Sequence, residues 1–344
     1  MAGRSENSTG ATIYLRKFDG TTGEILGDII LGDEGKVAYY PCNSVDKDSK
    51  GNVCISNLSL NIKSTPIKLH LVDLETGKLT EVASLTYSGS TSRCDHITLT
   101  GDVVAGNFTV YAAFAKAKVV VRWNYENGVQ KSQEVCTLTL NPSSMSTLGT
   151  APRIILIDDN SFFIRGGETE WARYNFSSGK VVDSFTNNPS LKPIAGEANG
   201  GTWFTLNGTK YMALPYADYT DPLGHQFMLM KADDDLSFKS MEEMWTMPKD
   251  GMGAVNSTTF QADADYVQTS VGRIMLYLFV PGNGLCAYEV VDTAASGVED
   301  CTLDASNATE VARYDIHGRI LAQPTNGINI VKMSDGTAKK VVVK

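Results

Sequence analysis

The chain has 344 residues, of which 42% are hydrophobic and 20% are charged, and its net charge is −9. This composition excludes a disordered chain, because it provides enough apolar surface for a large core. The acidic balance and the lack of a clustered basic stripe exclude nucleic acid as a partner, and no apolar run reaches the length of a transmembrane segment.

One unit recurs along the chain: an apolar strand, a turn with glycine, asparagine or aspartate, and a second strand. It occupies 13–31, 69–85, 119–138 and 171–186, with a looser copy at 227–247. The turns are spaced by roughly 50–57 residues, which is the length of one four-stranded blade of a β-propeller. The hairpins are therefore predicted to be the outer strands of successive blades, with equivalent positions at Leu71, Val121 and Tyr174.

Further strands lie between these hairpins and complete the blades. Strand pairs are predicted at 37–60, 94–114, 152–166, 200–216 and 255–280, followed by a lone strand at 284–291. The fold class is therefore all-β, with a β-propeller over residues 1–296. Five blades are favoured, because strands 12–17 and 25–31 would then pair beside 284–291 and close the ring. Six blades are possible if an inner strand pair precedes the first hairpin.

The pattern of apolar segments and turn residues changes near Gly297, and residues 297–344 are predicted to form a small C-terminal antiparallel β module. Polar turns with glycine separate short apolar segments, as expected for hairpins. The predicted strands are 309–316, 318–322, 327–333 and 338–343. The module has about 45 residues, which is marginal for independent stability, so we expect it to lean on the propeller.

The tail resembles a known family. The matching residues are Arg313-Tyr314-Asp315, Gly318-Arg319, Gly327, Ile330-Val331, Gly336 and the basic end from Lys339 to Lys344. This pattern is similar to the C-terminal sorting domain of the type IX (Por) secretion system of Bacteroidetes-type bacteria, although Asn329 replaces the usual aromatic residue and the unit is short. The propeller segments at 48–58 and 71–79 resemble, more loosely, propeller proteins of unknown function from the same bacteria.

The resemblance of the tail implies a location. A sorting domain implies a secreted protein, or one at the outer membrane or cell surface, and a periplasmic one if the tail is vestigial. The first residues, MAGRSENSTGATIYL, have no apolar signal region. We therefore expect that the chain begins after a leader has been removed.

The cysteines and histidines do not form a recognisable metal site. The six cysteines, Cys42, Cys54, Cys94, Cys136, Cys286 and Cys301, contain no CxxC pair, and the four histidines are scattered. Most of the cysteines are expected to be buried thiols, while Cys42 and Cys54 could form a disulfide in an oxidising compartment. The segment 46–52 has two aspartates at calcium-loop spacing, but Lys50 stands where an oxygen ligand is needed, so a tight turn is predicted. No cofactor and no metal are expected.

Motifs for nucleophilic catalysis are also missing from the sequence. No GxSxG elbow occurs, and Cys94 and His96 share a strand face in a way that is common for packed residues. No catalytic residue is therefore assigned, and enzymatic activity is the less favoured interpretation.

The loops that converge on one face of a propeller provide the candidate ligand-binding residues, because they surround the central channel. The segments 165–171 and 216–226 are the most promising, since they combine carboxylates, aromatic rings and turn residues. The candidates are Arg93, Asp95, His96, Arg153, Arg165, Glu168, Glu170, Trp171, Tyr216, Asp218, Tyr219, Asp221 and His225.

These features predict a monomeric binding or scaffold module that is secreted or lies at the cell surface. Its ligand would be a glycan, or a protein or peptide. The alternative is a glycan-active hydrolase or lyase, which needs two carboxylates roughly 5–10 Å apart. The acids that could form such a pair are Glu168, Glu170, Asp218 and Asp221.

Overall fold

The computed structural model describes residues 2–4, 13–20, 22–32, 42–140, 143–191, 199–217, 224–253, 262–292, 309–315, 318–334 and 338–343. The chain divides into two compact units, Met1–Val291 and Asp292–Lys344. The expected boundary between residues 296 and 297 lies outside the described residues.

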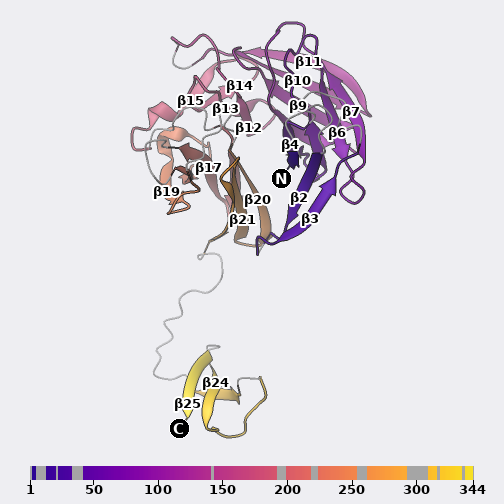
Figure 1. Ribbon diagram of the computed structural model, residues 1–344. Coiled ribbons are helices and arrows are strands. Elements are labelled where there is room, and N and C mark those ends of the chain that lie inside the picture. The colour runs from indigo at the N-terminus through magenta and orange to yellow at the C-terminus, as the bar shows by residue number, and fades with distance from the viewer. Residues whose placement is uncertain are drawn as a thin grey trace. The chain divides into compact units, whose positions relative to one another are not determined.

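The first unit is a ring of antiparallel sheets (Figure 1). Within its described residues there are six sheets, which we call blades 1 to 6 in chain order. Four blades have four strands each, and blades 1 and 6 have three. Blade 1 contains β1 (Ala2–Arg4), β2 (Ile13–Phe18) and β3 (Ile25–Ile30), and blade 6 contains β20 (Asp263–Ser270), β21 (Arg273–Val280) and β22 (Gly284–Val291).

The four-stranded blades each use strands that are consecutive in the chain. Blade 2 contains β4 (Ser44–Lys47), β5 (Val53–Ser56), β6 (Ile67–Val72) and β7 (Leu79–Leu85). Blade 3 contains β8 (Ile97–Asp102), β9 (Asn107–Ala113), β10 (Val119–Glu126) and β11 (Val129–Thr137). Blade 4 contains β12 (Arg153–Leu156), β13 (Ser161–Arg165), β14 (Ala172–Asn175) and β15 (Val181–Ser184). Blade 5 contains β16 (Thr202–Leu206), β17 (Thr209–Ala217), β18 (His225–Ala232) and β19 (Glu242–Met247).

The predicted β-propeller is thus confirmed. Its described part has six sheets, which matches the alternative of six blades and not the favoured five. The predicted closure by pairing of the first strands with 284–291 is wrong. Strand β2 pairs with β1 on one side and with β3 on the other, so it has no free edge for β22. Blade 1 instead contacts blade 6 through the Tyr277 hydroxyl, which donates a hydrogen bond to the Gly20 carbonyl (3.2 Å).

The outer hairpins repeat the same turn. The predicted pairs at 69–85, 119–138 and 171–186 are the outer strands of blades 2, 3 and 4. In two of these turns the glycine amide donates to the residue that starts the turn, from Gly77 to Asp73 (2.8 Å) and from Gly179 to Asn175 (2.9 Å). This alignment makes Val72 the equivalent of Tyr174, so the predicted register at Leu71 is off by one. Val72 and Tyr174 are both buried, as the period of two in a strand requires.

The hydrophobic core lies between neighbouring blades. One buried cluster joins blades 1 and 2, another joins blades 2 and 3, and a third joins blades 3 and 4. A larger cluster extends from blade 4 through blade 5 to one face of blade 6. Each sheet therefore gains most of its stability from apolar side chains that lose contact with water on the faces of its neighbours.

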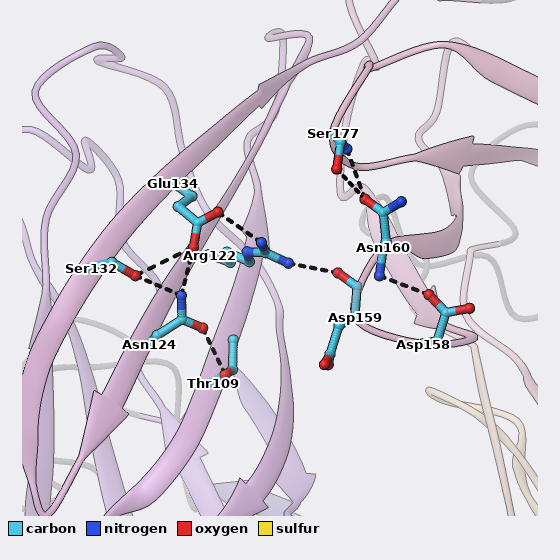
Figure 2. Close-up of polar contacts among 9 residues, drawn as sticks. All are labelled: Thr109, Arg122, Asn124, Ser132, Glu134, Asp158, Asp159, Asn160 and Ser177. Atoms are coloured by element: carbon cyan, nitrogen blue, oxygen red, sulfur yellow. Dashed lines mark hydrogen bonds and ion pairs between the residues drawn. The ribbon is translucent and has the colours of Figure 1, made fainter.

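A polar clamp also joins blades 3 and 4 (Figure 2). Arg122 of β10 binds Glu134 of β11 (2.7 Å) and donates a hydrogen bond to the carbonyl of Asp159 in the β12–β13 turn (2.6 Å). Its guanidinium lies 4.2 Å from the ring centroid of Phe176. Asn124 completes the network by donating to both Ser132 and Glu134. Arg122, held by Glu134 of its own blade, therefore links blade 3 to blade 4 through a hydrogen bond and a cation–π contact.

Helices are scarce in the described part of the chain: two 3₁₀ turns occur there, Phe185–Asn187 and Phe238–Ser240. Neither has the length or the hydrophobicity that a membrane crossing requires.

The described part of the second unit is a sheet of three strands in the order β23 (Glu310–Tyr314), β24 (Gly327–Met333), β25 (Ala338–Val343). The predicted strand 318–322 is wrong, because these residues make a single bridge, from Ile320 to Tyr314, next to the hydrogen bond from the Asp315 amide to the Arg319 carbonyl (2.9 Å). Asn329 is fully buried and organises the sheet. Its amide donates to the carbonyl of Thr325, and its oxygen accepts from the Thr325 amide and from Arg313.

Candidate functional site

A central cavity lies on the axis of the ring, between the innermost strands of blades 2 to 6. Its volume is about 520 Å³, which is within the usual range for small-molecule sites. The strands β4, β8, β12, β16 and β20 are the first of their blades, and each contributes side chains to its wall. The lining residues run from Val45 to Tyr266 in the sequence, and Arg153 is the one predicted ligand-binding residue among them.

Arg153 at the start of β12 is the most connected charge in this cavity. One nitrogen of its guanidinium hydrogen-bonds to Nδ1 of His96 (2.7 Å), and another forms an ion pair with Asp263 of β20. A guanidinium can only donate, so Nδ1 of His96 must accept, and His96 is neutral with its proton on Nε2. Two of the predicted ligand-binding residues, His96 and Arg153, are thus in direct contact.

A second ion pair in the cavity joins Lys47 of β4 to Asp265 of β20. Both side chains are about half exposed to the cavity or to solvent. The first pair joins blade 4 to blade 6, and the second joins blade 2 to blade 6. Basic and acidic groups on non-adjacent blades therefore neutralise each other within the channel.

Asp46, next to Lys47, is a half-buried residue in the cavity wall. Burial raises its pKa from 3.8 to about 7, while hydrogen bonds from backbone amides and the positive charge of Arg153 act in the opposite direction. The Leu99 amide donates to its Oδ2 (2.8 Å). The carboxylate of Asp263 adds to the upward shift. Asp46 can therefore both hold and release a proton near neutral pH.

Arg93 and Asp95 stabilise the segment that leads into β8. Arg93 binds the carboxylate of Asp95 through two nitrogens, at 3.0 and 2.7 Å, and the Asp95 side chain is almost completely buried. Burial raises the pKa of Asp95, and the pairing with Arg93 opposes that shift. The side chain of Asn43 donates to the backbone carbonyl of Asp95 (2.7 Å). These contacts hold His96 in position beside Arg153.

The end of β13 and the loop from β13 to β14 carry four more candidates, none of which lines the central cavity. Arg165 is buried and donates to the Thr169 carbonyl (3.1 Å), and Trp171 is fully buried in the core of blades 4 to 6. Glu168 is exposed and accepts from Thr147 (2.8 Å), while Oε2 of Glu170 is buried without a hydrogen-bond partner. A role for these residues in ligand binding stays a prediction.

The last group of candidates lies at the end of β17 and in the segment that leads to β18. The last residue of β17, Ala217, pairs with His225 of β18. His225 is buried and exchanges backbone hydrogen bonds with Met252 and Gly253. Tyr216 is partly buried on β17. Asp218, Tyr219 and Asp221 lie outside the described residues. The carboxylate separations proposed for a hydrolase that uses these aspartates are therefore untested.

Several residues that line the central cavity were not among the predicted candidates. Asp46 was part of a segment interpreted as a turn, and Asp263 and Asp265 were not considered, nor were Lys47 and Trp203. A weak signal existed, because Asp263 and Asp265 alternate at the start of an inner strand and so face the same side. Their partners on distant blades could not be identified without the ring.

Within the described residues, no three or more histidine, cysteine, aspartate and glutamate side chains are grouped in a way that could hold a metal ion. Cys42, Cys54, Cys94, Cys136 and Cys286 are free thiols, so the disulfide considered between Cys42 and Cys54 is not formed. Burial raises the pKa of Cys42 and Cys54 to about 12, which makes both thiols poor nucleophiles.

Comparisons with known proteins bear on the fold. No family model matches the chain, and no curated protein matches it. The chain is similar to the crystal structure of a DUF4623 family protein from Bacteroides eggerthii, with a TM-score of 0.59 and 14% identity over 84% of this chain and 70% of that one. A putative 6-phosphogluconolactonase from Bacteroides fragilis gives a TM-score of 0.41 and 13% identity over 98% of this chain and 91% of that one. The WD40 β-propeller domain of Doa1 gives a TM-score of 0.36 and 11% identity over 85% of this chain and 89% of that one. At these identities the similarity to the first structure is one of fold alone.

Proposed function

We propose that this protein is a binding module that is secreted or lies at the cell surface, and that its central cavity takes a neutral glycan. The observation that carries the proposal is the pairing of charges in the cavity. Arg153 is bound to Asp263, and Lys47 is bound to Asp265. A charged ligand would have to compete with a partner that is already in place, whereas hydroxyl groups can join such pairs as both donors and acceptors.

The remaining lining of the cavity also suits a sugar. Threonines from β8 and β16 offer hydroxyls, and the aromatic rings of Trp203 and Tyr266 lie in the wall. Trp203 is oriented by the hydrogen bond from its indole nitrogen to the Leu156 carbonyl (2.7 Å). Aromatic faces and balanced hydrogen-bonding groups are the features that bind an uncharged polyhydroxyl ligand.

A glycan array, followed by titration calorimetry of the bound glycans, tests this proposal. Thr202→Phe places a ring in the cavity wall and is expected to weaken binding at least tenfold. Thr205→Phe is the matched control, because Thr205 is exposed on the same strand and does not line the cavity. Equal binding by both variants, or binding of charged peptides in preference to neutral glycans, would refute the assignment.

A glycan-active hydrolase or lyase is the second candidate, and Asp46 is the observation that favours it. A carboxyl with a pKa of about 7 has the property of a general acid in glycoside cleavage. The test is release of reducing ends from glycans that bind. Asp46→Asn should abolish this release and retain binding. A lack of release by the wild-type protein on every bound glycan would leave the binding module as the function.

We also propose that residues 297–344 act as a sorting unit. The resemblance of the motif residues supports this proposal, as does the exposure of Lys339 and Lys340 on β25. A periplasmic reporter fused to residues 297–344 should reach the cell surface in a host with type IX secretion. A reporter that stays in the periplasm would mean that the tail does not sort.

A further inference from the structure

The interface between blade 6 and blade 1 differs from the other interfaces of the ring. Among the described residues, buried apolar clusters join blades 1 and 2, 2 and 3, 3 and 4, and 4 through 6. None of these clusters joins blade 6 to blade 1. That interface instead contains a cavity of about 820 Å³, which we call the side cavity.

The two faces of β21 show this difference directly. One face packs on blade 5 and carries four fully buried side chains, Ile274, Leu276, Leu278 and Val280. The opposite face carries Tyr277 and Phe279, which are partly exposed and line the side cavity. Their partners across the strand pair, Ala287 and Leu285 of β22, line it as well. A wall of apolar and aromatic side chains is therefore left without the close contacts that the other blades have.

Blade 1 provides the other wall with Arg16, Phe18 and the turn at Gly20. Arg16 is held by Asp28 through two hydrogen bonds, at 2.8 and 2.9 Å. The hydrogen bond from Tyr277 to Gly20 closes one edge. The apolar area here belongs to a defined space between two sheets and not to an exposed surface.

The side cavity adjoins the central cavity. Five of the lining residues are shared by the two cavities: Val45, Arg153, Asp263, Ala264 and Asp265. The charges at this junction are already paired, with Arg153 on Asp263 and Asp265 on Lys47. A space with paired charges and a space with apolar and aromatic walls therefore lie next to each other.

We propose that the side cavity binds the apolar part of an amphiphile whose neutral polar head lies in the central cavity, and that the ligand is a glycoside with an alkyl or aryl group. The choice of a sugar as the head rests on the proposed function. The apolar part rests on the side cavity alone.

The test uses n-hexyl and n-octyl β-D-glucoside, each below its micelle-forming concentration, with glucose as the reference. Burial of two further methylene groups should strengthen binding of the octyl over the hexyl glycoside on the order of tenfold. Ala287→Phe, which fills the side cavity from β22, should remove this dependence on chain length. Glu289→Phe is the control, because residue 289 lies on the same face of β22 and does not line the cavity.

The outcomes separate this inference from the proposed function. Equal affinities of the hexyl and octyl glycosides, or an unchanged dependence in a folded Ala287→Phe variant, would overturn the side-cavity site. Binding of free oligosaccharides in that case would leave the proposed function intact. A chain-length dependence shown equally by n-hexanol and n-octanol would support the apolar site and contradict the glycan head. Thermal unfolding monitored by circular dichroism establishes that each variant is folded.

Discussion

Alanine substitutions of three glycines at equivalent turn positions distinguish two contributions to the loss of stability: backbone strain and a lost contact between blades. Gly23, Gly77 and Gly179 all have φ in the left-handed region, at +74°, +74° and +64°. An alanine at Gly23 would meet nothing within 4 Å. A Cβ at Gly77 would lie 2.0 Å from the Ile30 carbonyl oxygen, and one at Gly179 would lie 1.9 Å from that of Thr137.

The close approaches exist because the turn of one blade docks on the last strand of the blade before it. The carbonyl of Gly77 accepts from the Gly32 amide (3.0 Å), and that of Gly179 accepts from the Thr139 amide (2.8 Å). Gly23→Ala should therefore cost only the left-handed strain, about 1 kcal/mol. Gly179→Ala adds a displaced contact of about 1–3 kcal/mol and a weakened hydrogen bond of about 1 kcal/mol, giving a total of about 3–5 kcal/mol.

Urea unfolding followed by tryptophan fluorescence measures these differences. In a thermal unfolding experiment, each kcal/mol of lost stability should lower the melting temperature by on the order of 2 °C for a chain of this size. Gly77→Ala should resemble Gly179→Ala, since the geometry at the two positions is the same. Equal losses in Gly23→Ala and Gly179→Ala would refute the docking of the turns between blades.

Three further substitutions test other parts of the structure. Arg122→Ala removes the clamp between blades 3 and 4 and should cost about 1–3 kcal/mol, whereas Arg273→Ala, in an exposed pair with Glu289, should cost less than about 1 kcal/mol; equal costs in urea unfolding would contradict the clamp. Asp46 has a folded pKa of about 7 against an ordinary 3.8, so the folded state holds this proton more tightly than the unfolded state. The stabilisation from this tighter proton binding is complete below about pH 4 and is lost as the pH rises to about 7. The stability of Asp46→Asn relative to wild type should therefore increase across this range, on the order of 2–4 kcal/mol. A constant difference between pH 4 and pH 8 would contradict the raised pKa. In the tail, Asn329→Phe restores the aromatic residue of the sorting family but loses the bonds to Thr325 and Arg313, so amide exchange of β23 to β25 in the full chain should accelerate, while Ile328→Phe, at an exposed position, should have little effect. Unchanged exchange in Asn329→Phe would show that Asn329 does not organise the sheet.

The local features of this fold could be predicted from the sequence, because each blade carries its own signals. The turns at Gly77 and Gly179 follow strands whose apolar residues alternate, and such short-range patterns define a hairpin. Closure of the ring could not be predicted in the same way. It depends on β1, a strand of three residues with no apolar alternation, whose pairing with β2 removes the edge that β22 was expected to use.

The candidate site was only partly predictable for a related reason. His96 and Arg153 were found because they precede or begin inner strands, where the loops converge. Asp263 and Lys47 were missed, because their importance comes from partners on blades that are distant in sequence. Trp171 was selected as an aromatic residue in a polar loop, yet it is fully buried, since neighbouring blades cover its ring.

A crystal structure of the protein with a glycan selected on the array is the most direct test of the central claim. We expect density for the sugar in the central cavity, in contact with Thr202, Trp203 and the pair of Arg153 and Asp263. Density for the sugar on the outer faces of the blades, with the central cavity holding only water at the same ligand concentration, would contradict the claim.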